Sequence, residues 1–271
     1  MRFFVPGTLQ ADTDLALPPG PARHAQVRRV QPGDELLLFD GQGCDWPAQV
    51  LRVGRNSVEV HVGAPRPVAT EMPLAVLLAV GMPANERMDG LIEKATELGV
   101  ASIQPLLCER AVLRLEGERA ERKRAHWQAV AETACEQSGR ARVPAVAPVL
   151  ALAAWLAQLP RQGSGAELVS GTGTGTGTGS GSGSGPGLRL VLSLRADARP
   201  LAALPSSLAA PRARVLALSG PEGGLSPAEE DAARAAGFQP VSLGPRTLRA
   251  DTAPLALLAW FSLQRNGPAA G

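Results

Sequence analysis

The chain has 271 residues, a length that suits one large domain or a small domain followed by a medium one. Its 27 basic and 25 acidic residues leave a net charge of +2, which by itself gives no reason to expect a nucleic-acid partner. Three scattered cysteines and three scattered histidines argue against a disulfide framework and against a metal site. The start does not read as a signal peptide and no apolar run is long enough to span a bilayer, so we expect a cytoplasmic protein without a membrane partner.

The first part of the chain alternates short apolar runs with turn signals. The runs ELLLF (35–39), WPAQVLRV (46–53) and SVEVHV (57–62) are separated by DGQG and GRN, and the last run alternates with a period of two. This pattern predicts a small β-barrel or sheet in residues 1–68. A proline-rich stretch at residues 63–73 marks the boundary between this domain and the next.

From residue 73 to residue 266, predicted strands alternate with predicted helices. Continuous apolar runs predict buried strands over 74–80, 101–107, 188–194, 214–220 and 240–243, and helical periodicity predicts helices over 85–99, 118–139, 151–159 and 252–264. Such alternation is typical of an α/β domain with a mostly parallel sheet. Residues 163–187, dominated by Gly, Ser and Thr, predict a disordered insertion in a loop of this domain.

The stretch VLALSGPEGGLSPAEE (215–230) predicts a buried strand, a glycine-rich turn and a helix. A capping box, Ser226 with Glu229, marks the helix start. Neither GxGxxG nor GxxxxGK[ST] is present, and the turn carries Glu222 without a lysine or arginine, which disfavours a phosphate-bearing ligand. S-adenosylmethionine (AdoMet) fits, because it has a sulfonium, an ammonium and a ribose diol but no phosphate. A strand-to-helix turn without any ligand is the alternative.

A second glycine turn lies in LGPRTLRADTA (243–253). Two arginines, Arg246 and Arg249, stand between apolar elements, where a purely structural connection would not need them. Asp251 is placed to cap the last helix. This loop is therefore a second candidate part of a binding site.

The two turns together resemble the RsmE family, the 16S rRNA uridine-N3 methyltransferases of the SPOUT class. RHAQVRRVQPGDELLLFDGQG is similar to the family's PUA-like RNA-binding barrel, and ERMDGLIEKATELGVASIQPLLCERAV and KRAHWQAVAETACEQSGRARVP are similar to its central blocks. The resemblance implies a SPOUT-type parallel sheet with a C-terminal trefoil knot, bound AdoMet, a homodimer, and 16S rRNA of the small ribosomal subunit as partner.

The resemblance also implies site residues. It places the cofactor in and beside the two turns, at Leu194, Leu218, Ser219, Gly220, Pro221, Glu222, Gly223, Gly224, Leu243, Gly244, Leu248 and Thr252. This sequence departs from the family's pattern at two places: Asp251 replaces the usual glutamate, and LSLRADA replaces a motif that more often reads His-Pro-Glu-Ala. A knotted RNA-binding protein without methyltransferase activity is the alternative that these departures support.

The chemistry suggests roles for further side chains. N3 of uracil carries a proton, so catalysis needs a base or a cation that stabilises the uracil anion. Arginine stays protonated and matches a uracil carbonyl, which favours Arg249 or Arg246, with Glu136 or Glu222 as a candidate base. Residues expected to contact RNA are Arg23, His24 and Arg28 in RHAQVRR and Gln137, Ser138 and Arg140 in CEQSGR.

Overall fold

The computed structural model describes residues 1–72, 74–84, 86–160, 187–204 and 214–263, which form two compact units. The first unit comprises residues 1–71 and 129–144, and the second unit comprises the remaining described residues. The sequence predicted a first domain that ends at residue 68 and did not assign residues 129–144 to it. The predicted insertion at 163–187 lies outside the described residues except for Gly187.

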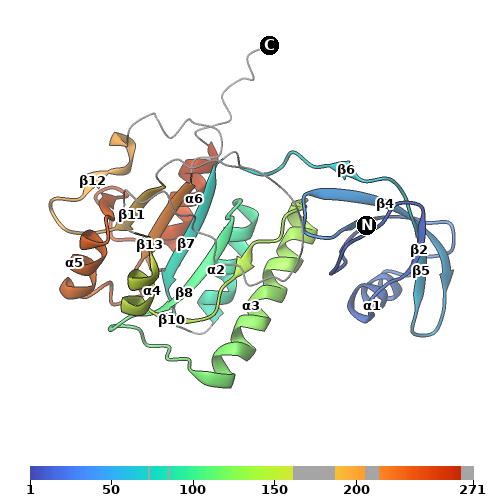
Figure 1. The fold of residues 1–271 in the computed structure, drawn as a ribbon, viewed down its shortest axis with the longest axis horizontal. Helices are drawn as coiled ribbons and strands as arrows, with labels where there is room; N and C mark the ends of the chain where they lie inside the picture. The colour runs from blue at the N-terminus through green and yellow to red at the C-terminus, as the bar shows by residue number, and fades with distance from the viewer. Residues whose placement is uncertain (73, 85, 161–186, 205–213, 264–271) are drawn as a thin grey trace, which may run out of the picture. The chain divides into compact units, whose positions relative to one another are not determined.

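The first unit is built on a six-stranded sheet (Figure 1). Its strands run in the order β1-β3-β4-β5-β2, with β6 paired to β4; β1 and β3 are parallel and the other pairs are antiparallel. The elements are β1 (Arg2–Phe4), β2 (Thr13–Ala16), helix α1 (Pro19–Val27), β3 (Glu35–Phe39), β4 (Cys44–Val53), β5 (Val58–Val62) and β6 (Arg66–Pro67). The strands predicted at 35–39, 46–53 and 57–62 are confirmed as β3, β4 and β5.

The alternation of apolar residues explains how this sheet builds its core. Val58, Val60 and Val62 are fully buried on one face of β5, whereas His61 on the other face is exposed. The C-terminal part of helix α3 (Gly117–Ser138) joins this unit through the start of the chain. There Arg2 donates hydrogen bonds to the carbonyl oxygens of Cys135 and Arg140.

The second unit is an eight-stranded sheet in the order β10-β8-β7-β13-β11-β14-β12, with β9 paired to β8, and every pairing in it is parallel. Its strands are β7 (Ala75–Gly81), β8 (Ser102–Leu107), β9 (Ala145–Val146), β10 (Leu150–Ala151), β11 (Leu188–Leu192), β12 (Arg199–Pro200), β13 (Arg214–Ser219) and β14 (Gln239–Ser242). All five strands predicted for this region are present, as β7, β8, β11, β13 and β14.

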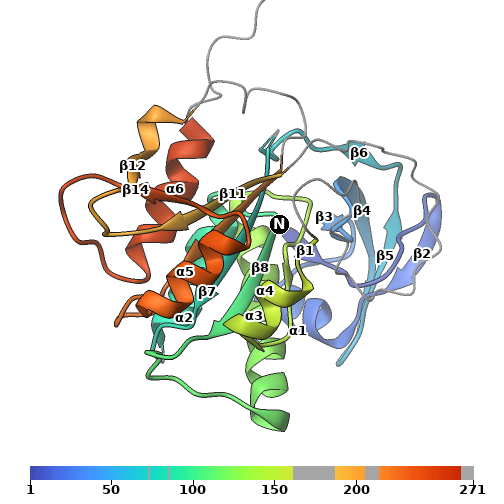
Figure 2. The ribbon, with the colours of Figure 1, turned by 60° about the vertical axis from the view of Figure 1, so that its left-hand side comes forward.

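Helices cover both faces of this sheet. They are α2 (Glu86–Glu97), the first part of α3, α4 (Leu152–Gln158), the 3-10 turn η1 (Leu201–Ala203), α5 (Pro227–Ala235) and α6 (Thr252–Leu263). Figures 1 and 2 show α4 and α5 on one face, and α2 and α6, which contact each other, on the other face. The helices predicted from periodicity match α2, α3, α4 and α6, and the helix predicted after the first glycine turn is α5. The predicted strand–helix alternation is confirmed.

Candidate cofactor site

Three loops meet where neighbouring strands of the second unit end. Strand β11 lies between β13 and β14, so the loops that follow these three parallel strands emerge at the same edge of the sheet. They border a cavity of about 530 Å³. This volume lies within the range of about 300–1,000 Å³ that small-molecule sites occupy. The cavity is therefore the candidate functional site.

The loop after β13 is a tight turn that requires glycine. A Cβ atom on Gly220 would lie 2.7 Å from the backbone nitrogen of Leu225, and Gly224 has a φ of +67°. The amide of Gly224 donates to the carbonyl of Pro221 across the turn. The predicted capping box is confirmed: Ser226 and Glu229 exchange hydrogen bonds at the start of α5. The turn is thus held at both ends and brings its backbone to the cavity wall.

The acidic residue of this turn is paired with groups from another part of the sequence. Oε1 of Glu222 accepts a hydrogen bond from the backbone N–H of Ala84 and lies 3.4 Å from Nη1 of Arg87, at the start of α2. Arg110, which follows β8, donates to the carbonyl oxygen of Gly223. Arg87 and Arg110 both line the cavity. The turn itself has no basic residue, as the sequence indicated, but the fold brings two arginines to it from other segments. The expectation that the site disfavours phosphate therefore rests on the local sequence only.

The loop after β14 offers unengaged cations. Gly244 has a φ of +111°, and its amide donates to Oγ of Ser242, which shapes the bend. Arg246 and Arg249 line the cavity, are exposed, and make no side-chain hydrogen bond or ion pair with a residue that the structure describes. Asp251 stands just before α6 as predicted, but its Oδ1 is buried without a hydrogen-bond partner in the described chain. The two guanidinium groups remain available to a ligand.

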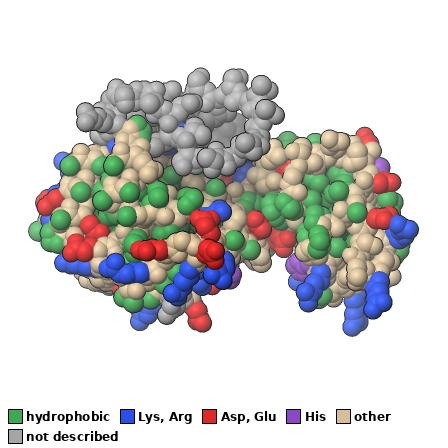
Figure 3. All heavy atoms as spheres, turned by 60° about the horizontal axis from the view of Figure 1, so that its bottom comes forward, with side chains coloured by type: hydrophobic (Ala, Val, Ile, Leu, Met, Phe, Trp, Pro, Cys, Tyr) green, Lys and Arg blue, Asp and Glu red, His purple; other side chains and the backbone are tan. Residues whose placement is uncertain are grey.

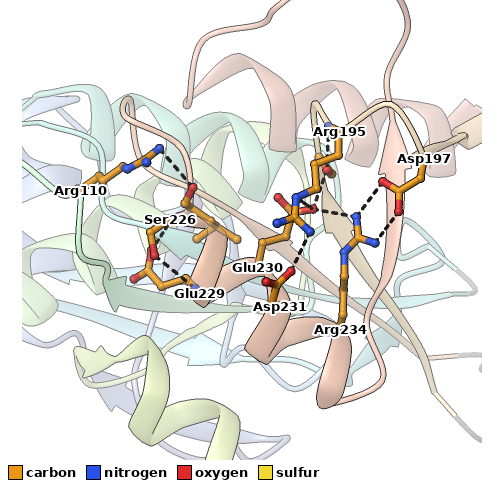
Figure 4. Close-up of polar contacts among 10 residues, drawn as sticks. Arg110, Arg195, Asp197, Ser226, Glu229, Glu230, Asp231 and Arg234 are labelled. Atoms are coloured by element: carbon orange, nitrogen blue, oxygen red, sulfur yellow. Dashed lines mark hydrogen bonds and ion pairs between the residues drawn. The ribbon is translucent and has the colours of Figure 1, made fainter.

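The loop after β11 carries one member of a buried polar pair, and the other member, Glu230 of α5, is labelled in Figure 4. Oγ of Ser193 donates to Oε1 of Glu230 at 2.7 Å, and both residues are more than nine-tenths buried and line the cavity. From the sequence, a ligand contact near Arg195 was an open question. In the structure the guanidinium of Arg195 pairs with Asp231 on α5. The loop after β11 is therefore anchored to α5.

Most residues predicted to bind the cofactor come together at this cavity. Those that line it are Leu194, Ser219, Gly220, Pro221, Glu222, Gly223, Gly224, Leu243, Gly244 and Leu248. Two others do not line it: the side chain of Leu218 is fully buried in the core, and Thr252 begins α6, where its amide donates to the carbonyl of Arg249. Contacts between these residues and a cofactor remain predictions.

The residues present fit AdoMet. The cavity combines glycine turns that allow a ligand to approach the backbone, apolar side chains such as Leu192 and Val241, and the carboxylates Glu222 and Glu230. This set suits a nucleoside with hydroxyl and ammonium groups.

Among the described residues, we find no group of three or more His, Cys, Asp or Glu side chains able to hold a metal ion. No described helix is long and apolar enough to cross a membrane.

Glu136, a predicted base, belongs to the first unit rather than to the cavity lining. Its Oε1 accepts from the backbone N–H of Phe4, and its Oε2 lies 3.6 Å from Nδ1 of His24. His24 also stacks edge-on against Phe3. The described contacts give Glu136 a role in joining α3 to the strands of the first unit.

The residues predicted to contact RNA all lie in the first unit, with different exposures. Arg23 of α1, Arg28 just after this helix and Gln137 are exposed, and Figure 3 shows basic side chains (blue) at the surface of this unit. Arg140, in contrast, is 3% exposed and donates to both carboxylate oxygens of Glu71. Oγ of Ser138 donates to the carbonyl of Ala134. These contacts give Arg140 and Ser138 structural roles rather than a free donor group for RNA.

Outside the two glycine turns, the sequence missed four polar residues of the cavity: Arg87, Arg110, Ser193 and Glu230. Arg87 follows β7 at the start of α2, Arg110 follows β8, and Ser193 follows β11. Because ligands of open α/β sheets bind at the carboxyl ends of the strands, the positions after each predicted strand were a usable signal. Glu230 carried no such signal, since it lies within the first turn of α5.

Comparison with known proteins identifies the family of this chain. The RNA methyltransferase domain family matches residues 70–262, and the RNA methyltransferase PUA domain family matches residues 22–63. The ribosomal RNA small subunit methyltransferase E of Synechocystis is 35% identical over 86% of this chain and 67% of that protein. The protein of the same name from Mycobacterium bovis is 32% identical over 84% of this chain and 78% of its own length.

Solved structures agree with these relatives. The crystal structure of a ribosomal RNA small subunit methyltransferase E from Neisseria gonorrhoeae bound to S-adenosyl methionine has a TM-score of 0.79 to this chain. The two are 32% identical, and the match covers 96% of this chain and 95% of that one. The resemblance predicted from the two glycine turns is thereby confirmed, and the chain belongs to the ribosomal RNA small subunit methyltransferase E (RsmE) family.

Proposed function

We propose that this protein transfers the methyl group of AdoMet to N3 of one uridine in 16S rRNA. The observation that carries the proposal is the meeting of three strand-end loops at one cavity, in a chain similar to a methyltransferase E crystallised with S-adenosyl methionine. Family membership makes the chain an AdoMet-dependent rRNA methyltransferase. The position of the methylated atom and the 16S rRNA are the finer parts of the proposal.

The turn residues would hold the methyl donor. Backbone groups around Gly220 and Leu243 suit the adenine, and Leu248 completes an apolar wall. AdoMet, when bound, supplies a methyl group that is already activated on a sulfonium sulfur. The protein then has two remaining tasks, which are to align the acceptor with the methyl group and to control the acceptor's proton.

The unengaged arginines are the proposed catalytic cations. The guanidinium of Arg249 or Arg246 donates to a uracil carbonyl oxygen and stabilises the negative charge that develops as N3 loses its proton. Glu222 is the remaining candidate base, since its Oε2 has no described partner and the residue lines the cavity. Glu136 lacks that support.

The first unit is the proposed RNA-binding part. Its match to a PUA domain of RNA methyltransferases and the exposed Arg23 and Arg28 support this role. Neutralising phosphates would make binding weaken as salt rises. Because the named relatives are ribosomal RNA small subunit methyltransferases, we place this protein in the cytoplasm, where that RNA is assembled into subunits.

A second copy of the chain is the proposed partner of α6. Pro254, Leu257, Leu258 and Phe261 of this helix are buried, yet its other side is also apolar, with Trp260 half-buried and Leu263 71% exposed. A helix that is apolar all round is normally covered on all sides. A Trp260→Glu substitution is expected to shift the protein from dimer to monomer in sedimentation equilibrium, and a wild-type monomer at micromolar concentration would contradict the proposal.

The proposed trefoil knot also has topological support. From β13 the chain passes through α5 to β14, which lies beyond β11, and then returns to α6, which packs against β7 and β13. A chain that crosses and recrosses β11 in this way can be threaded through the loop it encloses. Tracing residues 214–263 in an experimental density map tests the threading.

Mass spectrometry of 16S rRNA tests the function. In a strain that lacks the gene, one uridine is expected to lose 14 mass units, and purified protein with AdoMet should restore them. Protein-free rRNA and assembled small subunits, offered separately, define the substrate. Tight RNA binding with no methylation of either substrate would favour the alternative of an inactive RNA-binding protein, which the comparisons do not favour.

A further inference from the structure

A carboxylate outside the two glycine turns reaches the wall of the cavity. Glu230 is 8% exposed, and its Oε1 accepts from Oγ of Ser193 at 2.7 Å and from Nη2 of Arg234 at 3.0 Å. Its Oε2 makes no hydrogen bond or ion pair with any residue that the structure describes, and it is not among the buried atoms without a partner. Glu230 therefore presents one accessible acceptor at the cavity.

Neighbouring charged side chains hold this carboxylate in place (Figure 4). Arg234 also donates two hydrogen bonds to Asp197, and Arg195 donates to Asp231. The hydrogen bonds from Arg234 lower the pKa of Asp197, which keeps this partner charged. Three carboxylates thus share two guanidinium groups, and the cluster retains one negative charge. A ligand group that meets it must donate hydrogen bonds.

Two features favour a hydroxyl over an ammonium as that group. Oε1 of Glu230 already faces two guanidiniums, Arg234 at 3.0 Å and Arg195 at 3.7 Å, which offset part of its charge, whereas a hydroxyl needs only an acceptor oxygen. The neighbours of Ser193 on the cavity wall are apolar: Leu192 pairs with Val241, whose carbonyl accepts from the amide of Ser193. Such side chains suit a flat base, and the hydroxyls of a nucleoside lie one sugar ring away from its base.

We propose that Glu230, oriented by Ser193, accepts a hydrogen bond from the ribose hydroxyls of the methyl donor. This inference rests on the proposed methyl-donor site and adds a specificity residue to it. A hydrogen bond to a charged group predicts that removing the hydroxyls weakens binding about ten-fold to hundred-fold. The residue then selects ribonucleoside donors over deoxyribonucleoside ones.

Calorimetry with truncated nucleosides tests this without rRNA. The probes are 5′-methylthioadenosine, which lacks the amino-acid part of the donor, and its 2′,3′-dideoxy counterpart. We expect the wild type to prefer the ribose probe at least ten-fold and Glu230→Gln to reduce that preference below three-fold. Asp231→Asn is the matched control, because it alters the same cluster outside the cavity lining, and it should keep the wild-type preference.

Two outcomes would overturn the inference directly. The first is equal binding of both probes by the wild type, and the second is an unchanged preference for the ribose probe in a folded Glu230→Gln variant. A loss of AdoMet binding in that variant with methylthioadenosine unaffected would assign Glu230 to the ammonium instead. If Glu230→Gln does not fold, Ser193→Ala takes its place and should reduce the preference several-fold. A ribose preference without 16S rRNA methylation would refute the proposed function only.

Discussion

The two glycine loops of the cavity differ in how their charged side chains are used. In the loop after β13, Glu222 is paired with Ala84 and Arg87, and the capping box fixes the start of α5. In the loop after β14, Arg246 and Arg249 have no side-chain partner in the described chain. The first loop is therefore built to keep a shape, whereas the second keeps its cations free for a ligand. Under the proposed function, this contrast leads us to expect cofactor binding mainly from the first loop and the reaction mainly from the second.

The largest effect is expected in the second loop. Replacing Arg249 with alanine should lower kcat by at least ten-fold. The expected size is on the order of a hundred-fold, the usual cost of removing a donor that stabilises developing charge. AdoMet affinity measured by calorimetry should stay within about three-fold, because the contact forms with the uracil. Arg214→Ala is the control, since this exposed arginine lies at the start of β13, away from the cavity. An unchanged kcat would remove Arg249 from the mechanism, and Arg246→Ala would then be tested in its place.

In the first loop, the strongest effect should be on binding. A Cβ on Gly220 would lie 2.7 Å from the nitrogen of Leu225 and 2.9 Å from the carbonyl carbon of Gly224, and these backbone atoms cannot move aside without deforming the turn. Gly220→Ala should weaken AdoMet binding about ten-fold to hundred-fold, the equivalent of the 1–3 kcal/mol that overpacking costs.

A glycine elsewhere in the second unit separates this effect from a general one. Gly90 lies in α2, and a Cβ there meets nothing within 4 Å. Gly90→Ala should leave AdoMet affinity unchanged and raise stability by up to about 1 kcal/mol, because alanine favours a helix. Wild-type affinity in Gly220→Ala would show that this turn does not shape the cofactor site.

The paired carboxylate should be less sensitive than the free guanidinium. Glu222→Gln keeps an acceptor oxygen for the N–H of Ala84 and loses only the charge that faces Arg87, in an ion pair that is partly exposed. We expect kcat to fall less than ten-fold in steady-state assays. A loss above a hundred-fold, the size expected of a general base, would instead make Glu222 the group that takes the N3 proton.

The smallest effect concerns the capping box. Ser226→Ala should lower the free energy of unfolding by about 1 kcal/mol in urea titrations, with kcat near the wild-type value. Ser262→Ala in α6 is the control, because no hydrogen bond of its side chain is described, and it should change stability by less than about 0.5 kcal/mol. Equal stability of both variants would show that the cap is not needed to hold the first loop.

Much of the second unit was predictable because its elements are long and strongly patterned. Met88, Leu91, Ile92 and Ala95 recur on one face of α2 and are buried, and the apolar run before them is β7, an inner strand of the sheet. The short strands β1, β2, β6, β9, β10 and β12 were missed, since two to four residues cannot show a period. The role of residues 129–144 was missed for another reason: Arg2 binds carbonyls more than a hundred residues away.

The cavity shows the same division between local and distant information. Both glycine turns were found from the sequence, because a tight bend needs particular residues next to one another. Arg87, Arg110, Ser193 and Glu230 were not found, because they come from four different segments. The sequence likewise assigned Arg140 to RNA, whereas its guanidinium is buried against Glu71.

The amino-acid sequence alone thus determined the family, the strand–helix alternation and the two bends that shape the site, since each depends on residues close together in the chain. Only the tertiary structure decided which charges in the site are paired and which are free. The physical reason is that an ion pair or a buried hydrogen bond depends on distance in space, and the order of the parallel strands brings distant segments to one edge of the sheet.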